Sequence, residues 1–160
     1  MGRLLFQCFR LELPLDLAPT MNEYARARPW DHARVQDAVD AAVLAARARW
    51  SGWHAGFTER AETKRRKPTP KNPATSRIFI RRTGGRRRLV RVARESSREP
   101  DELTCDVLGG KVPIDRLVQA GVLVGDSRKW IEREGVWRPA NPKQGRVIFE
   151  VFDIREEVDP

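Results

Sequence analysis

The sequence predicts a small α+β fold: a single domain with a mixed β-sheet and two main helices packed on one face. Three observations support this prediction. Apolar segments that are typical of strands lie near both ends of the chain. A long stretch with helical spacing of its apolar residues follows the N-terminal strand segment. A shorter predicted helix precedes the two C-terminal strand segments. The resulting order of strand, helix, hairpin, helix, strand and strand is typical of α+β proteins. At 160 residues, the chain is long enough to bury one core, so we expect residues 1–160 to form one domain.

The first third of the chain predicts a strand and a long helix. Residues 4–13 are rich in Leu and Phe, and Pro14 ends this strand, while residues 15–24 are expected to form an ordered loop. Asp31 is a candidate N-cap for the helix. One face of that helix carries apolar residues at three- and four-residue spacing: Val35, Ala38, Val39, Ala42, Val43, Ala46 and Trp50.

The middle of the chain predicts a basic linker and a hairpin. Residues 58–75 are rich in Lys, Arg, Pro and Thr and bury little apolar surface, so we expect a flexible linker or insertion. Residues 76–82 and 86–94 alternate like strands, and Gly84-Gly85 between them is a hairpin turn signal.

The last third predicts a second helix and two strands. Pro113 suits the first turn of a helix, because its missing N–H has no partner there, and Gly121 suits the helix end. Residues 130–134 predict a weak strand and residues 146–154 a strong one.

The positive charge of the chain is concentrated in one region. The chain has 31 Lys and Arg against 22 Asp and Glu, a net charge of +9. Between Arg60 and Arg94 there are 14 basic residues and one acid, Glu62, so this region carries +13 and the remainder −4. Such a patch attracts a phosphate backbone and releases counterions when it binds one. The alternative is a solvated basic loop that improves solubility.

Cysteine and histidine usage excludes some classes of protein. Cys8 and Cys105 are far apart and form no disulfide framework, which favours a reducing cytoplasm. With two histidines and no cysteine cluster, a zinc site is not expected. The apolar run at residues 4–6 is too short for a signal peptide or a membrane span, so no membrane association is expected.

Two aspartates near the second helix are candidate metal ligands. Asp106 precedes this helix and Asp126 follows it, so a chain reversal could bring both to one end of the sheet. Carboxylates that converge on Mg²⁺ can polarise a phosphodiester. Lys111 could stabilise the charge that develops on the phosphate. The alternatives are solvated loop acids, a helix cap at Asp106 and a surface lysine.

Order and landmarks along nearly the full chain resemble the RusA family of Holliday-junction resolvases. The opening strand and the loop with Pro19, Thr20 and Asn22 resemble the start of that family. The family then has a core motif D-x-D-N-L-x-K, a helix ending near Ala-Gly, an Asp-Asp pair and a final strand after a glycine. The matching positions here are Thr104-Cys105-Asp106-Val107-Leu108, Lys111, Ala120-Gly121, Gly125-Asp126-Ser127 and Gln144 to Glu150.

The resemblance implies a homodimer that cuts branched DNA (four-way junctions) with Mg²⁺, for which Mn²⁺ can substitute. Asp106 and Asp126 would hold the metal, and Lys111 would steady the phosphate. Thr104 and Gly125 stand where the family has acids, so two expected carboxylates are missing, and Asp101 or Glu102 is a candidate replacement for one. These departures leave a second reading open: a catalytically weak or inactive protein that binds junctions or other nucleic acid on the same fold.

The basic region supplies the candidate nucleic-acid contacts. They are Lys64, Arg65, Arg66, Lys67, Lys71, Arg81, Arg82, Arg86, Arg87, Arg88 and Arg91. A third alternative is that the protein is not a nucleic-acid-binding protein but an interaction protein, and that its basic region binds an acidic partner.

Overall fold

The computed structural model describes residues 3–71 and 75–156, and the chain divides into two compact units. The first comprises Met1–Ala55 and Arg86–Pro160 and is called the sheet unit below. The second, Gly56–Gly85, is called the hairpin unit. Both helices and strands are well represented, which confirms the predicted α+β class.

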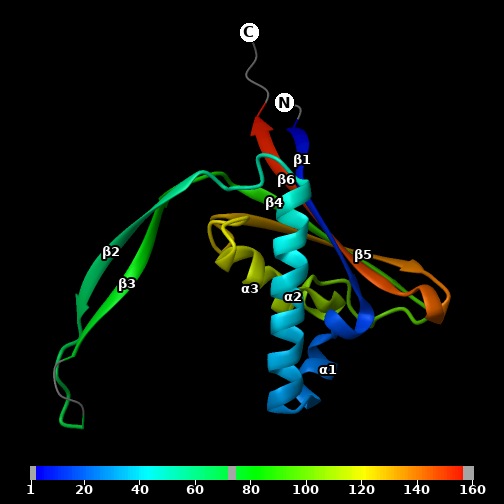
Figure 1. Ribbon diagram of the computed structural model, residues 1–160, viewed down its shortest axis with the longest axis horizontal. Coiled ribbons are helices and arrows are strands. Elements are labelled where there is room, and N and C mark those ends of the chain that lie inside the picture. The colour runs from blue at the N-terminus through cyan, green and yellow to red at the C-terminus, as the bar shows by residue number, and fades with distance from the viewer. Residues whose placement is uncertain (1–2, 72–74, 157–160) are drawn as a thin grey trace. The chain divides into compact units, whose positions relative to one another are not determined.

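The sheet unit contains a four-stranded mixed sheet (Figure 1). Its order is β1 (Arg3–Pro14), β6 (Arg146–Glu156), β4 (Arg88–Ser96) and β5 (Ile131–Pro139). β6 is antiparallel to both β1 and β4, whereas β4 and β5 run parallel, which confirms the predicted mixed sheet. β5 is therefore an edge strand, and its neighbour β4 is central.

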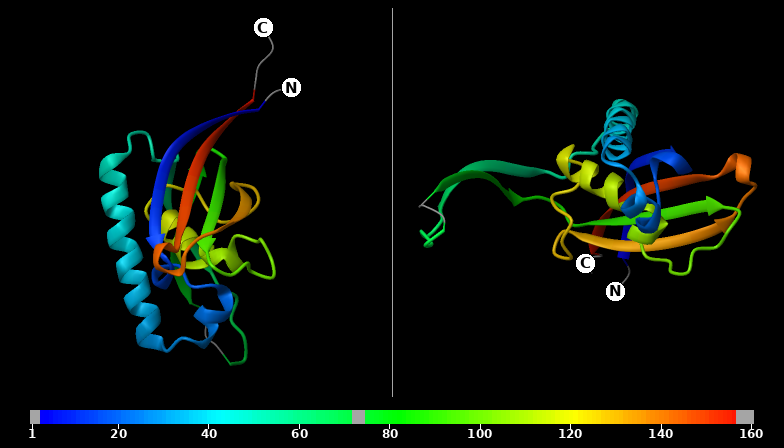
Figure 2. Two further views of the ribbon diagram at one scale, coloured as in Figure 1. Left: turned by 90° about the vertical axis from the view of Figure 1, so that its right-hand side faces the viewer. Right: turned by 90° about the horizontal axis from the view of Figure 1, so that it is seen from below.

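The helices of this unit cover one face of the sheet (Figure 2). They are α1 (Met21–Arg26), α2 (Pro29–Arg49) and α3 (Lys111–Gln119). The predicted apolar face of α2 is confirmed, because Val35, Val39 and Val43 are buried. The predicted start is wrong: the cap position is Arg28, and Pro29 occupies the first turn, where its fixed φ favours a helix.

The expected loop at residues 15–24 contains two short helical segments. A 3-10 turn spans Leu15–Leu17, and α1 begins after Thr20. The Thr20 hydroxyl accepts a bond from the Glu23 amide at 3.3 Å, and the Thr20 amide donates to the Glu23 carboxylate at 2.7 Å. This reciprocal capping box satisfies amides that a helix end leaves unpaired, which explains why the helix starts there.

The hairpin unit corrects two predictions about the middle of the chain. β2 (Phe57–Arg65) and β3 (Ser76–Gly84) form an antiparallel pair, so the expected linker 58–75 begins with a strand. Residues 72–74 of that linker lie outside the described residues. β3 also does not pair with β4 around Gly84-Gly85, because β4 is paired on both sides within the sheet unit. These two glycines have φ values of 72° and 96°, but they end β3 and begin the connection to β4 without closing a hairpin.

The core lies between the sheet and its helices. It includes Phe9 of β1, Val92 of β4, Phe149 of β6, Leu117 of α3 and Val39 of α2, all fully buried. The predicted later elements are confirmed as α3, β5 and β6, although both strands are longer than expected. Among the described residues, no helix is long and apolar enough to cross a membrane.

Candidate functional site

A cavity of about 810 Å³ lies beside the edge strand β5 within the sheet unit. Its lining comes from three segments: the stretch before α3, the loop after α3, and β5 with the residue before β4. The lining residues are Arg87, Leu103, Thr104, Cys105, Asp106, Asp126, Ser127, Arg128, Ile131, Glu132, Arg133 and Gly135. Asp106 and Asp126, predicted from the sequence as a pair, thus line the same cavity.

Glycines allow the segment before α3 to pack closely against its neighbours. The residues Asp106–Gly110 form a short π-helical turn, η2, in which Gly109 has φ 103°. A Cβ on Gly109 would lie 2.4 Å from the Ala18 carbonyl oxygen. A Cβ on Gly135 of β5 would lie 2.0 Å from the Leu103 carbonyl oxygen. Only glycine permits these approaches: the first packs η2 against Ala18, and the second packs the chain before Asp106 against β5.

The loop after α3 brings Asp126 back toward β5. Gly121 has φ 80°, and the amides of Val122 and Leu123 both donate to the Leu117 carbonyl, which ends the helix. Val122 and Leu123 are fully buried, and the chain then passes Asp126. A turn closed by the Trp130 amide and the Ser127 carbonyl at 2.9 Å starts β5.

Arg133 joins the two aspartate segments. Its Nη1 lies 3.3 Å from Oδ1 of Asp106, and its Nη2 donates to the backbone carbonyl of Asp126 at 2.9 Å. One guanidinium therefore bridges the segments before and after α3. The carboxylate of Asp106 and the main chain of Asp126 lie within reach of the same side chain.

Further cations and one acid complete the polar lining. Arg87 lies 3.2 Å from the Glu132 carboxylate, which also accepts a bond from Arg3 at 2.6 Å. The hydrogen bond from Arg3, with the charges of Arg3 and Arg87, lowers the pKa of Glu132. With Arg128 and Arg133, the cavity presents three arginines, the residue type best suited to bind phosphate oxygens.

Oxygen atoms of the kind that Mg²⁺ binds line the cavity. Mg²⁺ is commonly held by one or two carboxylates, with waters and substrate phosphates filling the remaining positions. Asp106 and Asp126 would provide the carboxylates of such a site, and Thr104 and Ser127 add hydroxyls to the lining. Within residues 3–71 and 75–156, no group of three or more His, Cys, Asp or Glu is arranged to hold a metal by itself.

Two other predicted site residues lie away from this cavity. Asp101 lines a separate cavity with Glu23, Arg94 and other residues. Lys111, at the start of α3, forms an ion pair with Asp115 at 3.6 Å and lines a third cavity with Gln36. The described residues therefore bring Asp106 and Asp126 together, without Asp101 or Lys111 beside them.

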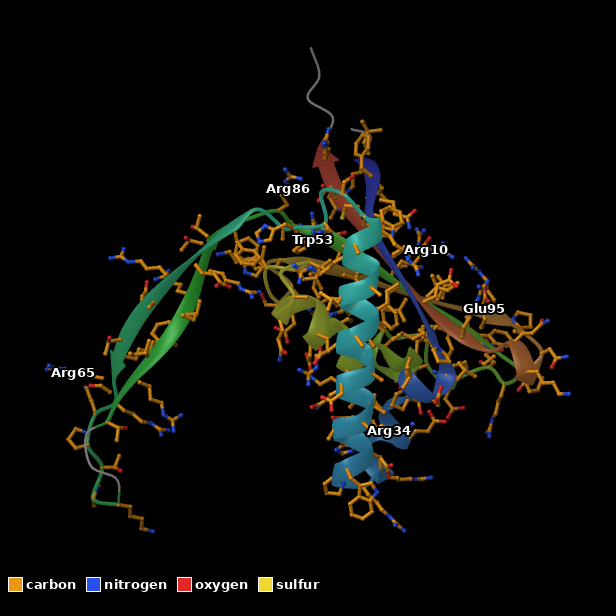
Figure 3. The ribbon with its side chains drawn as sticks, viewed as in Figure 1. Arg10, Arg34, Trp53, Arg65, Arg86 and Glu95 are labelled. Atoms are coloured by element: carbon orange, nitrogen blue, oxygen red, sulfur yellow. The ribbon has the colours of Figure 1, made fainter. Side chains whose placement is uncertain are left out.

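The predicted nucleic-acid residues divide between the two units. Lys64, Arg65, Arg81 and Arg82 belong to the strands of the hairpin unit, and Arg66, Lys67 and Lys71 follow β2. The side chain of Arg65 projects outward from the hairpin (Figure 3). The hairpin unit holds nine Lys and Arg against two Glu, so +7 of the net charge of +9 lies there.

Arg88 is the clearest exception among the predicted contacts. Its side chain is 0% exposed and lies 2.8 Å from the Asp153 carboxylate. It also donates to backbone carbonyls of Val122, at 2.6 Å, and of Trp53. The expected phosphate contact does not fit this burial, because every one of these bonds satisfies a group inside the sheet unit.

Arg86 and Arg91 lie nearer the surface but have partners. Arg86 is 3.1 Å from the second oxygen of Asp153, with its side chain 60% exposed. Arg91 bonds Glu134 at 2.8 Å and lies over the Phe152 ring. A ligand would compete with these acids or use the guanidinium donors that they leave open.

Comparison with known proteins does not assign the chain to a family. No protein-family model and no curated protein sequence matches it. The function therefore rests on the geometry of the chain's own residues.

Sequence reasoning missed the residue that connects the site. Arg133 lies in the segment predicted as a weak strand, and the missed signal was its alternation with Ile131 and Gly135 along β5. Residues two apart on a strand point to the same face, so these three share the face that lines the cavity.

Proposed function

We propose that the protein is a RusA-like, Mg²⁺-dependent endonuclease that cuts branched DNA such as four-way junctions. The observation that carries the proposal is the shared cavity of Asp106 and Asp126, which lie on opposite sides of α3 in the sequence. Its arginines supply the phosphate-binding groups that a DNA substrate needs.

In this proposal two acidic side chains of the cavity bind the metal and the basic side chains bind the phosphate. Asp106 and Asp126 hold the metal, while Arg87, Arg128 and Arg133 bind and orient the phosphodiester. Mg²⁺, when bound, acts as a Lewis acid on the phosphate and favours deprotonation of the attacking water. The Asp106–Arg133 pair is partly exposed, and such pairs contribute about 0–1 kcal/mol, so Arg133 can exchange Asp106 for a phosphate oxygen.

The proposal includes a homodimer that acts in the cytoplasm. Two copies, each with one such cavity, would nick opposed strands of a junction. Cys8 and Cys105 are both free thiols, which is consistent with a reducing compartment. Sedimentation equilibrium with and without a four-way junction measures the stoichiometry, and one protein copy per junction would contradict the dimer.

The direct test is a nicking assay on a synthetic four-way junction with Mg²⁺ or Mn²⁺. Asp106→Asn and Asp126→Asn should each abolish nicking while junction binding persists. Asp115→Asn is the matched control, because Asp115 is a partly exposed acid on α3 that pairs with Lys111 outside the cavity. No nicking by the wild-type protein, or equal nicking by all three variants, would defeat the catalytic proposal.

A second candidate function is a junction-binding protein without catalysis. The observation that favours it is the ion pair of Asp106 with Arg133, since a guanidinium then supplies the positive charge that a metal ion would bring. This candidate predicts salt-sensitive junction binding that is unchanged by chelation of divalent ions. Calorimetric titration with Mg²⁺ separates the two, because the binding protein should show no heat that depends on Asp106.

A further inference from the structure

The hairpin unit has two chemically different faces. Side chains alternate across a strand, so residues two apart share a face, and register partners share it as well. One face carries Arg60, Lys64, Arg77 and Arg81, all exposed, and is called the basic face below. The other face carries small and apolar residues, among them Ala61, Thr63, Ile78 and Ile80, with two cations, Arg65 and Arg82, and one acid, Glu59.

The basic face places like charges directly opposite each other. Lys64 pairs in register with Arg77, and Arg60 pairs with Arg81. Like charges directly across an antiparallel pair are destabilising, and a lone two-stranded hairpin is marginally stable in water. Glu62, between the two pairs, contacts Arg81 at a distance of 3.5 Å. A bound polyanion would remove the repulsion between both pairs at once.

The aromatic rings of the hairpin favour backbone contact over base stacking. Lys64 Nζ lies 5.1 Å from the centre of the Phe79 ring, and Arg82 lies 4.3 Å from the centre of the Phe57 ring. Proteins that bind single strands offer aromatic faces on which bases stack. Here a cation already covers one face of each ring, so the exposed charged groups on the basic face are positive charges that can bind phosphates.

The spacing of the cation pairs suits a duplex. Arg60 and Lys64 are four residues apart along β2, which corresponds to about 13 Å. The major groove of B-DNA is about 12 Å wide and admits a two-stranded ribbon. The two pairs can therefore reach different phosphates of one duplex.

We propose that the basic face of the hairpin unit binds the phosphate backbone of duplex DNA, as a contact surface additional to the cavity beside β5. The proposal deepens the proposed function, on which it rests for DNA as the ligand. It adds Arg60 and Arg77 to the contact residues. It removes Arg65 and Arg82, which lie on the other face; Arg82 is 19% exposed and bonds Glu59 at 3.0 Å.

The test compares two full-length variants that each lose four positive charges. The first is Arg60→Gln/Lys64→Gln/Arg77→Gln/Arg81→Gln on the basic face. The control is Arg26→Gln/Arg34→Gln/Arg49→Gln/Lys143→Gln, which replaces exposed cations of the sheet unit. Fluorescence anisotropy with a blunt duplex of about 20 bp is measured over a series of salt concentrations.

The basic-face variant should bind about 10- to 100-fold more weakly, with the slope of log K against log salt reduced by about 3–4. The control should stay within about threefold of wild type and keep the wild-type slope. Equal losses in the two variants, or no loss in the first, would overturn the proposal. Tighter binding of single-stranded DNA or of duplex RNA than of duplex DNA would overturn it too.

A second variant and a second measurement guard against unfolding of the hairpin. Lys64→Arg/Arg77→Lys keeps both charges and should bind like wild type, whereas a loss would contradict a backbone contact. Hydrogen exchange of amides in Phe57–Arg65 and Ser76–Gly84 should slow when the duplex is added to wild-type protein, and unchanged exchange would count against the proposal. Both readouts are independent of nicking, so this proposal and the proposed function can fail separately.

Discussion

The guanidinium of Arg133 lies 3.3 Å from the carboxylate of Asp106, at the wall of the cavity that both residues line. Their side chains are 35% and 41% exposed, so the pair is accessible and weakly held. Asp106 can therefore exist in two states, bonded to Arg133 or available to a metal ion. Under the proposed function, the balance between these states would determine how readily Mg²⁺ binds.

Replacing Arg133 should favour Mg²⁺ binding. In Arg133→Gln, Asp106 loses a competing cation, and the Mg²⁺ dissociation constant should fall by up to about fivefold, the equivalent of about 1 kcal/mol. Isothermal titration calorimetry measures it. Arg128→Gln is the matched control, because it removes an equal charge from the same cavity. An equal effect of both variants would mean that general electrostatics, and not the ion pair, is responsible.

Adding a carboxylate at Thr104 should strengthen the same site. Thr104 lines the cavity, and its hydroxyl accepts from the Val107 amide at 3.4 Å, a bond that an aspartate can also make. Thr104→Asp should lower the Mg²⁺ dissociation constant about tenfold or more, because ligand charge is the main determinant of affinity for such ions. Asp101→Asn should leave it unchanged, since Asp101 lines a different cavity. Unaltered Mg²⁺ binding by Thr104→Asp would show that this wall does not face the metal.

Periodicity alone could predict most of the sheet unit. The apolar repeat of α2 and the alternation in β1, β4 and β6 follow directly from burial of one face of each element. The start of α2 and the presence of α1 could not be obtained in this way. They depend on Pro29 and on the Thr20–Glu23 capping box, local effects that compete with several other plausible caps.

Strand pairing was the least predictable property. The position of Gly84-Gly85 between residues 76–82 and 86–94 predicts one hairpin. In the structure β4 instead lies between β5 and β6, and β3 pairs with β2. β2 could not be predicted as a strand because its composition is rich in charged residues. Its pairing with β3 depends on main-chain bonds more than on apolar burial. The sequence order could suggest that Asp106 and Asp126 converge, but the Arg133 bridge requires the parallel β4–β5 pairing.

The buried pair of Arg88 and Asp153 should dominate the stability of the sheet unit. Arg88 is fully buried, so loss of Asp153 would leave its charge without a carboxylate partner, and loss of Arg88 would leave the buried Asp153 with only the surface residue Arg86. Arg88→Met and Asp153→Asn should each reduce the free energy of unfolding by about 3–5 kcal/mol, measured by urea denaturation. Arg86→Gln should cost less than about 1 kcal/mol, because Arg86 contacts the same carboxylate from the surface. Similar costs for Arg86→Gln and Arg88→Met would contradict this assignment.

The two buried thiols should make the protein less stable in alkali. Burial raises the pKa of Cys8, and likewise that of Cys105, from the ordinary value of 9.0 to about 11. Between these values the unfolded chain loses thiol protons that the folded chain retains, so stability is complete below pH 9 and falls as the pH rises toward 11. The loss should be about 2–3 kcal/mol per thiol, measured by urea denaturation across this range. The Cys8→Ala/Cys105→Ala variant serves as the control and should show a correspondingly shallower decline; an identical pH profile would assign the alkaline loss to other groups.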